Sequence, residues 1–220
     1  MSGNKKVTVR MLTGQDYLTI RQCTENNDDF YTSNIFVAPA PDYIMKIISG
    51  YGYTAGAFLN SIFIGFASVV FPKGGKHNIG HLLRFDDEQM LAVAQIEHVY
   101  VVPEYRTKGT ATQLLNYLLS KIDSKYTIIL STVAPQNTPS LSLAFRIGQR
   151  VVSHSIVYGG DRFIMLGIRS LQRMSPDLGG TSDTLVFRTE LQMIDMLLES
   201  GYEAISFGVD KSSLRFTSRW

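Results

Sequence analysis

The chain has 220 residues, of which 45% are hydrophobic and 18% are charged, so it is long enough to bury the core of one large domain, alone or with an appendage. Its 21 basic and 19 acidic side chains are spread along the sequence, which excludes the basic stripe of a nucleic-acid-binding protein. The single cysteine, Cys23, excludes an intrachain disulfide and a soft metal cluster, and it favours a reducing cytoplasm. No apolar signal segment opens the sequence and no window approaches the ~20 apolar residues that cross a bilayer, so we expect no membrane partner.

The first part of the chain alternates strand-like and helical patterns. The patterns predict strands over 6–12, 54–60 and 61–71, and helices over 13–27 and 41–50. The second and third strands meet at Asn60-Ser61, which indicates a hairpin. From Pro72 to Gln89 the sequence is polar and contains glycine, so we expect a long loop, and such loops are often functional.

The middle of the chain has the order strand, helix, strand. The strand "LAVAQIEHVYVVP" ends at Pro103, and the helix that follows has an apolar face of Ala111, Leu114, Leu115, Leu118 and Ile122. The run "YTIILSTVA" is nearly all apolar, which is typical of a strand buried on both faces. This βαβ unit is expected to be parallel and right-handed. A short helix over 140–147 and strands over 150–158 and 162–168, joined by a Gly-Gly-Asp turn, complete the pattern.

The segment from residue 171 to 220 departs from this alternation. A linker-like stretch precedes a predicted helix with a capping box at Thr189 and Gln192, and a strand over 204–209 follows. The segment is too small to hold its own core, so we expect it to pack on residues 1–170 or on a second subunit as a homodimer.

The turn "EYRTKGTATQLL" has the features of a phosphate site. A helix N-terminus presents unpaired N–H groups and a partial positive charge. Gly109 allows a ligand to approach the backbone closely, and Thr110 and Ala111 beside it are small. Arg106 and Lys108 add two cations. The turn therefore predicts a pyrophosphate held by main-chain amides, although a basic, glycine-containing helix start would look the same, since neither GxxxxGK[ST] nor GxGxxG is present.

With "VYVVPEYRTKGTATQLL" followed by "STVAPQNTPSLSLAFRIGQRVV", the chain closely resembles the GNAT superfamily of acyl-CoA-dependent N-acetyltransferases from about Val7 to Ile168. The resemblance implies an α/β (α+β) fold with a mixed, mostly antiparallel sheet flanked by helices, to which the small C-terminal helix–strand extension is added. It also implies acetyl-CoA as co-substrate, an amine acceptor and no metal.

The family's motifs fall on defined positions of this chain. The resemblance implies that the strand before the turn pairs its backbone with the pantetheine arm, that the turn opens the helix that binds the pyrophosphate, and that an N-x-x-S pattern follows. The implied cofactor-binding residues are Val99, Tyr100, Val101, Arg106, Thr107, Lys108, Gly109, Thr110, Ala111, Asn137 and Ser140. Ala144 stands where many members carry a tyrosine that protonates the departing thiolate, so that role is not carried over.

The reaction also needs a proton acceptor. An alkyl ammonium of pKa ~10.4 must lose a proton, which costs roughly 4.6 kcal/mol near pH 7. Alternation places Glu97 on one strand face with Gln95, Val99 and Val101, and the resemblance implies that this face is directed toward the acyl group. Glu97 is therefore our candidate base, directly or through water; the alternative is a carboxylate paired with a cation. Alternation places His98 on the opposite face, which favours a structural histidine over a base. The resemblance makes a β-bulge plausible, which would shift that parity, and His98 is our second candidate.

Other polar residues have two interpretations each. Arg162 closes the acceptor pocket or, as we slightly favour, solvates a hairpin. Asp86 and Asp87 begin a solvated helix or recognise a cationic acceptor, and His77 and His81 are solvated loop residues rather than a metal pair. The leading hypothesis is an N-acetyltransferase that acts on a primary amine of a small molecule, peptide or protein. The alternative is a non-catalytic acyl-CoA-binding sensor or scaffold, and dimerisation through the extension is compatible with both.

Overall fold

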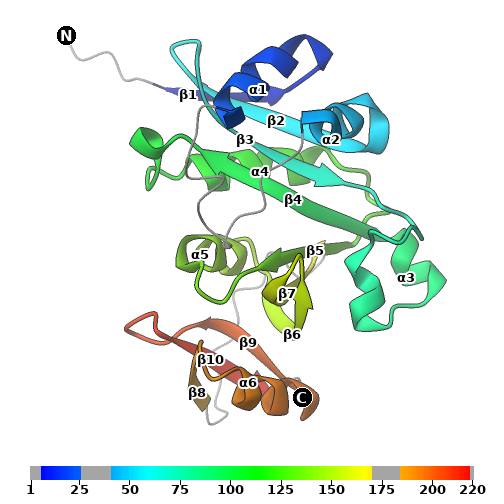
Figure 1. Ribbon diagram of the computed structural model, residues 1–220, viewed down its shortest axis with the longest axis vertical. Helices are drawn as coiled ribbons and strands as arrows, with labels where there is room; N and C mark the ends of the chain where they lie inside the picture. The colour runs from blue at the N-terminus through cyan, green and yellow to red at the C-terminus, as the bar shows by residue number, and fades with distance from the viewer. Residues whose placement is uncertain (1–5, 26–40, 170–183, 219–220) are drawn as a thin grey trace.

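The computed structural model describes residues 6–25, 41–169 and 184–218, and its strands form one sheet (Figure 1). The strands are β1 (Val7–Met11), β2 (Gly52–Leu59), β3 (Ile62–Val70), β4 (Val93–Val101), β5 (Ile128–Val133), β6 (Arg150–Val157), β7 (Gly160–Ile168), β8 (Thr184–Phe187), β9 (Tyr202–Phe207) and β10 (Ser213–Ser218). Their order in the ten-stranded sheet is β1-β2-β3-β4-β5-β7-β6-β9-β10-β8. Only β4 and β5 pair in parallel; the other neighbours are antiparallel. The predicted mixed, mostly antiparallel sheet is confirmed.

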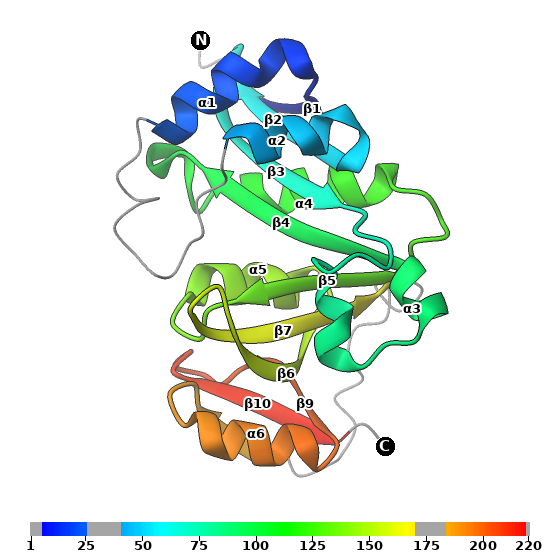
Figure 2. The same ribbon diagram turned by 45° about the vertical axis from the view of Figure 1, so that its right-hand side comes forward.

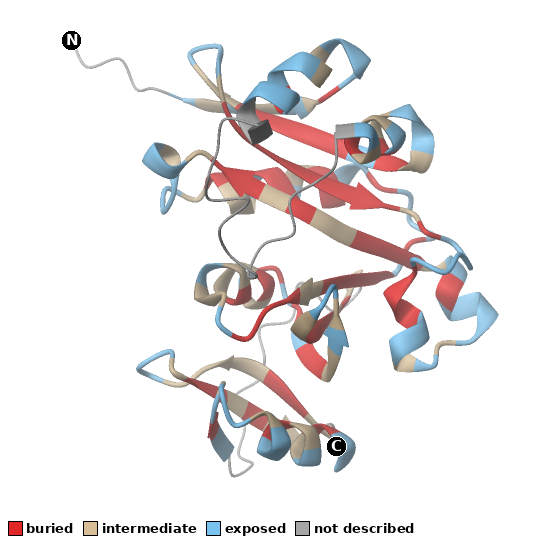
Figure 3. Cartoon of the chain, in the orientation of Figure 1, coloured by how far each residue is buried: buried red, intermediate tan, exposed pale blue. Residues whose placement is uncertain are grey.

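Helices cover both faces of the sheet (Figure 2). The α-helices are α1 (Tyr17–Glu25), α2 (Pro41–Lys46), α3 (Asp87–Leu91), α4 (Thr110–Lys121), α5 (Thr138–Arg146) and α6 (Leu191–Glu199). Leucines of α4 pack on one face of β1–β4, and Ile20 of α1 and Ile44 of α2 pack on the opposite face against Phe66 and Tyr100. Buried residues therefore run along the central strands, while the outer faces of the helices are exposed (Figure 3). No helix in the described part of the chain is long and apolar enough to cross a bilayer.

The two parallel strands separate soon after they begin. Val93 to Gln95 of β4 pair with Ile128 to Leu130 of β5, and the pairing stops there although β4 continues to Val101. β4 also contains a bulge: Ser68 of β3 faces His98, whereas the adjacent Val69 faces Ile96. Glu97 is therefore the extra residue, and the bulge considered from the sequence is present.

Two hairpins depend on left-handed backbone at their turns. Asn60 and Ser61 have φ of 49° and 66°, as a type I′ turn requires, which confirms the predicted β2–β3 hairpin. The β6–β7 turn lies at Tyr158 and Gly159, with φ of 55° and 76°, so the strands meet earlier than the predicted Gly-Gly-Asp turn.

The C-terminal extension has more strands than predicted. Besides α6 and β9 it contains β8 and β10, and β9 joins the sheet where Ala204 pairs with Val151 of β6. Glu190 is the N-terminal flanking residue of α6 and no side chain caps it, so the capping box at Thr189 and Gln192 is wrong. The predicted linker lies almost wholly outside the described residues.

The extension shares a core with the rest of the protein. One buried cluster contains Val133, Leu141, Ala144, Val151, Phe163 and Met165 together with Val186, Ile194, Leu198, Ala204, Leu214 and Phe216. Buried side chains of α6 therefore pack in one cluster with residues that lie before position 170.

The segment 72–89, expected to be one loop, contains local structure. A 3₁₀ helix spans Ile79–Leu83, and Asp86 accepts a hydrogen bond from the Gln89 N–H while the Gln89 side chain accepts one from the Asp86 N–H. This capping box begins α3, so the interpretation of the acidic pair as a helix start is confirmed.

Candidate active site

Two cavities open where β4 and β5 separate. The first, of about 700 Å³, lies at the N-terminus of α4 and is called the α4 cavity; the second, of about 440 Å³, lies against Glu97 and is called the Glu97 cavity. The residues that line both are Val99, Asn137, Ser140 and Leu143. The two cavities are therefore neighbouring parts of one site.

The α4 turn holds its shape through left-handed backbone. Thr107 and Gly109 have φ of 65° and 80°. A Cβ on Gly109 would meet no heavy atom within 4 Å, so backbone conformation, rather than lack of space, explains the glycine. Thr110, Ala111 and Thr112, whose N–H groups begin the helix, line the α4 cavity, which is the arrangement that binds anions.

The two predicted phosphate cations differ in position. Arg106 lines the α4 cavity, and its Nε donates to the carbonyl oxygen of Val101 at 2.9 Å. Lys108 lines neither cavity; its Nζ donates to the Glu104 carbonyl oxygen at 3.1 Å. Arg146 of α5 does line the α4 cavity, and no local pattern indicated it, because α5 reaches the turn only in the folded chain.

The remaining predicted donor residues come together at this site. The α4 cavity is lined by Val99, Tyr100, Val101, Thr107, Gly109, Thr110, Ala111, Asn137 and Ser140. Asn137 also begins α5, since its side-chain oxygen accepts the Ser140 N–H at 3.1 Å. The N-x-x-S pattern is thus a helix cap as well as part of the cavity wall.

Glu97 is held by two neutral groups. The Gln95 Nε2 donates to Glu97 Oε1 at 2.6 Å, and the Gln95 Oε1 accepts the N–H of Ile79 at 3.1 Å, which fixes the orientation of the amide. The Tyr43 hydroxyl donates a second hydrogen bond. Burial raises the pKa of the Glu97 carboxyl, and these two hydrogen bonds oppose the rise. Neither partner is the cation that an ion pair requires, and a carboxylate with a raised pKa suits general-base catalysis near neutral pH.

The bulge changes which side chains share a face of β4. Val99 and Val101 pack in the cluster beneath α4, whereas Glu97 and His98 both contact Tyr43, whose ring centroid lies 6.1 Å from that of His98. The prediction that Glu97 faces the same side as Val99 and Val101 is therefore wrong. Burial lowers the pKa of His98 to about 4, so its imidazole is neutral and weakly basic at pH 7.

Aromatic and basic residues complete the Glu97 cavity. Tyr43 and Tyr158 line the cavity, and Tyr51 packs against Tyr43 with ring centroids 6.2 Å apart. Burial raises the pKa of the Tyr43 and Tyr51 phenols, and the negative charge of Glu97 raises the pKa of all three. No local sequence pattern indicated them, because α2, the turn after it and the β6–β7 turn meet only in the folded chain. Ala144 lines the same cavity, and no phenol stands at that position.

Of the charged residues singled out in the sequence, some line the Glu97 cavity and others lie outside it. Arg162 is 6% exposed and lines the Glu97 cavity, so the interpretation as a solvated hairpin residue is wrong. His77 lines the cavity and His81 does not, while neither Asp86 nor Asp87 lines it. In the described ranges, no three histidine, cysteine, aspartate or glutamate side chains are grouped as a metal site would need.

The cavity at the α4 N-terminus, which suits phosphates, adjoins the cavity that contains the Glu97 carboxylate. This arrangement is typical of a group-transfer enzyme whose donor carries negative charge. The model of the acetyltransferase (GNAT) family matches residues 23–148, more than half of the chain, and the protein belongs to this family of acetyltransferases. A search of curated protein sequences found no match.

Solved structures of low sequence identity share the fold. NAA60 of Arabidopsis thaliana in complex with acetyl-CoA superposes with a TM-score of 0.58 at 18% identity, over 75% of this chain and 99% of that one. YncA of Salmonella typhimurium, a putative acetyltransferase with its cofactor acetyl-CoA, gives 0.58 at 17% identity over 79% and 99%. The aminoglycoside acetyltransferase AAC(6')-Ib in complex with coenzyme A gives 0.58 at 18% identity over 77% and 99%.

Proposed function

We propose that the protein transfers an acetyl group from acetyl-CoA to a primary amine by direct attack. The observation that carries this proposal is the pair of adjoining cavities, which share Val99, Asn137, Ser140 and Leu143. A long donor that begins at the α4 N-terminus would present its thioester beside Glu97.

The donor would be held in two ways. The first N–H groups of α4 would bind the pyrophosphate, with Arg106 and Arg146 supplying positive charge from the same cavity wall. β5 does not pair with β4 beyond Gln95, so the backbone from Val99 to Val101 borders the cavities instead. That segment would bind the amide groups of the pantetheine arm.

The acceptor, an alkyl ammonium, would lose one proton to Glu97, directly or through one water. The nitrogen then bonds to the thioester carbon, the carbon–sulfur bond breaks, the nitrogen releases its second proton to water, and the thiolate gains a proton. Because Ala144 carries no hydroxyl, the phenols of Tyr43 and Tyr158, which line the same cavity, are the candidate proton donors. Gln95 keeps the base oriented throughout.

Calorimetry with acetyl-CoA and a thiol-release assay over a panel of amines test the proposal. Gly109→Glu should abolish acetyl-CoA binding, because it places a bulky carboxylate where the phosphate would lie. Gly74→Glu is the matched control, since Gly74 has open space around it and lines neither cavity. Failure of the protein to bind any acyl-CoA would refute the proposal.

A non-catalytic acyl-CoA sensor is the second candidate, and Ala144 is the residue that favours it. Tight acetyl-CoA binding without thiol release on any amine would support the sensor. We further infer a cytoplasmic location from the single cysteine. A homodimer and a boundary between residues 1–170 and 171–220 stay predictions, which light scattering and limited proteolysis would test.

A further inference from the structure

We propose that the amine acceptor is a small amino acid-like molecule whose carboxylate binds Arg162 while its amine lies beside Glu97. This inference rests on the proposed acetyl transfer and names the class of acceptor. It follows from the charges that line the Glu97 cavity, from the burial of Arg162 and from the way β7 is held.

The charges on the wall of the Glu97 cavity are of both signs. Among the described residues that line it, the side chains with a full positive charge are Lys46 and Arg162, the acidic one is Glu97, and His77 and His98 are histidines. A purely cationic acceptor would meet one carboxylate and two positive charges there. An acceptor that carries both an amine and a carboxylate matches the two signs present.

Of the two lining side chains that carry a full positive charge, Arg162 is the more enclosed by protein. It is 6% exposed, whereas Lys46 and His77 are exposed side chains. Its Nη1 donates to the carbonyl oxygen of Asp161 at 2.8 Å. A guanidinium carries five N–H donors in a planar fork, so it can contact several acceptors at once and binds a carboxylate in a bidentate manner.

Tyr158 connects the two charges. It lies at the β6–β7 turn and lines the Glu97 cavity together with Glu97 and Arg162, in a volume of about 440 Å³. The negative charge of Glu97 raises the pKa of its phenol, and the positive charge of Arg162 lowers it. That cavity volume is at the lower end for small-molecule sites and suits a compact ligand.

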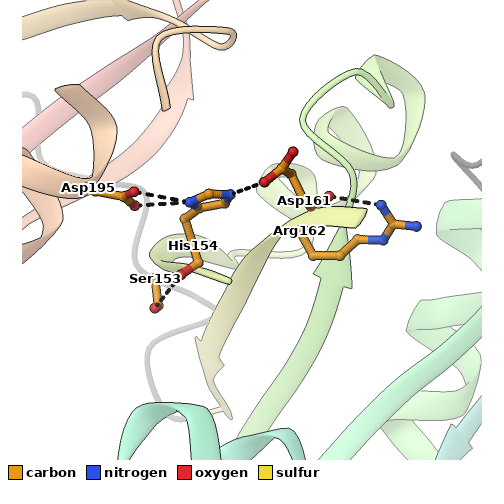
Figure 4. A network of polar contacts seen from close by, with 5 residues as sticks. All are labelled: Ser153, His154, Asp161, Arg162 and Asp195. Carbon is orange, nitrogen blue, oxygen red and sulfur yellow. Dashed lines mark hydrogen bonds and ion pairs between the residues drawn. The ribbon is translucent and has the colours of Figure 1, made fainter. Parts of the chain in front are cut away.

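The strand that carries Arg162 is fixed from the other side of the sheet (Figure 4). The Asp161 Oδ1 lies 3.0 Å from Nε2 of His154, and the Nδ1 of His154 lies 3.1 Å from Oδ1 of Asp195 on α6. Figure 4 shows the Asp161 side chain directed toward His154 and the Arg162 side chain directed away from it. The extension therefore helps to hold the acceptor end of the site in position.

Arg162 could instead bind the donor, and the cavities argue against that. Arg162 lines the Glu97 cavity and not the α4 cavity, where Arg106 and Arg146 lie. A donor role would raise the KM for acetyl-CoA in an Arg162 variant. An acceptor role would raise the KM for the carboxylate-bearing amine.

The test compares acceptors that differ in one group. Acetylation by the full chain is measured for an α-amino acid, for its carboxamide and for the amine that lacks the carboxyl group, all with the same side chain. A peptide with a free N-terminus and an amidated C-terminus represents protein acceptors. Because charge-assisted hydrogen bonds to a carboxylate discriminate by 1.5–3 kcal/mol, we expect the amino acid to have a kcat/KM roughly 10- to 100-fold above that of the carboxamide.

Arg162→Gln should bring this ratio close to one, and Arg162→Lys should restore part of it, while the KM for acetyl-CoA changes little. Arg150→Gln is the control. Arg150 of β6 forms an ion pair with Glu203 of β9 at 2.8 Å and lines neither cavity, so the ratio of kcat/KM for the amino acid to that for the carboxamide should stay as in the wild type.

Equal or better turnover of the carboxamide, the simple amine or the amidated peptide would overturn the inference. A preference that survives in Arg162→Gln would overturn it as well. If no amine is acetylated, the proposed transfer itself fails. Calorimetry of the amino acid and its carboxamide on the protein loaded with coenzyme A then decides the acceptor class, and equal affinities would refute it.

Discussion

Gly109→Ala tests whether the α4 turn depends on a residue without a Cβ. Gly109 has a φ of 80°, and a Cβ built on it would contact nothing within 4 Å. The substitution therefore adds no clash and changes only the cost of the left-handed backbone. That cost is about 1–2 kcal/mol for a residue other than glycine, so the free energy of unfolding should fall by a similar amount.

Gly74→Ala provides the matched control. Gly74 likewise has no heavy atom within 4 Å of an added Cβ, but its φ is outside the left-handed range. There alanine mainly restricts the unfolded chain, which leaves stability unchanged or raises it by about 0.4–1 kcal/mol. The two variants thus differ in backbone conformation and not in packing.

Urea denaturation of both variants and the wild type, without acetyl-CoA, gives the free energies by linear extrapolation. In thermal unfolding, Gly109→Ala should lower Tm by about 2–4 °C for each kcal/mol lost. Equal changes in the two variants would refute the argument, because the left-handed turn would then carry no penalty. The affinity for acetyl-CoA should fall in Gly109→Ala alone, because Gly109 lines the α4 cavity and Gly74 does not.

Three further predictions concern the base, the buried histidine and the shared core. Glu97→Gln should lower kcat by about 10²–10⁴-fold and leave the affinity for acetyl-CoA nearly unchanged. In the wild type, kcat/KM should rise with pH through the raised pKa of Glu97, because the base must be deprotonated. Turnover of the variant that equals the wild type at all pH values would move the role of base to another group. The pKa of His98 is about 4 when folded and ~6.5 when unfolded, so the unfolded state binds more protons between these values and stability is lost as pH falls through that window. Between pH 7 and pH 5 the wild type should lose about 2 kcal/mol more than His98→Gln, and parallel pH profiles would contradict this. Ile194→Ala should cost about 2–5 kcal/mol, since the fully buried side chain leaves a cavity between α6 and the sheet; a loss below 1 kcal/mol, measured by urea denaturation, would mean that the extension packs loosely.

The part of the site that could be predicted is local in sequence. The α4 turn needs a glycine, small neighbours and a cation within a few residues, and all of these stand between Arg106 and Ala111. The strand that precedes the turn and the buried strand after α4 are similarly marked by continuous apolar runs. Such features depend on neighbouring residues, so one sequence is enough to find them.

The sequence predictions that were wrong or incomplete concern features that tertiary packing sets. Arg162 follows a glycine turn that looks solvent-facing, yet it is buried on β7, a strand that lies between β5 and β6 in the sheet. Lys108 stands at the right place in sequence, but its flexible side chain turns back to the Glu104 carbonyl oxygen. β8 has four residues and was missed because its partner, β10, is far along the chain.

The bulge at Glu97 shows the limit of periodicity. If side chains alternate strictly, the face of one residue in β4 predicts the face of all the others. A single extra residue in the strand reverses this prediction for every residue after it. The sequence "QIEHVYVV" carries no glycine or other mark of that residue. Its position is set by pairing with β3, which places Ser68 opposite His98.

The shared core of the extension has a consequence for synthesis on the ribosome. The clusters around α4 and around α1 and α2 draw on residues up to Ile147, so the first half of the sheet can close while later residues are still being added. The cluster beneath α6 needs Leu214 and Phe216 of β10, both fully buried, together with Val133 and Phe163. This cluster is complete only once β10 has left the exit tunnel, so apolar side chains of β6 and α5 lack their partners until then, and exposed apolar surface of this kind favours aggregation.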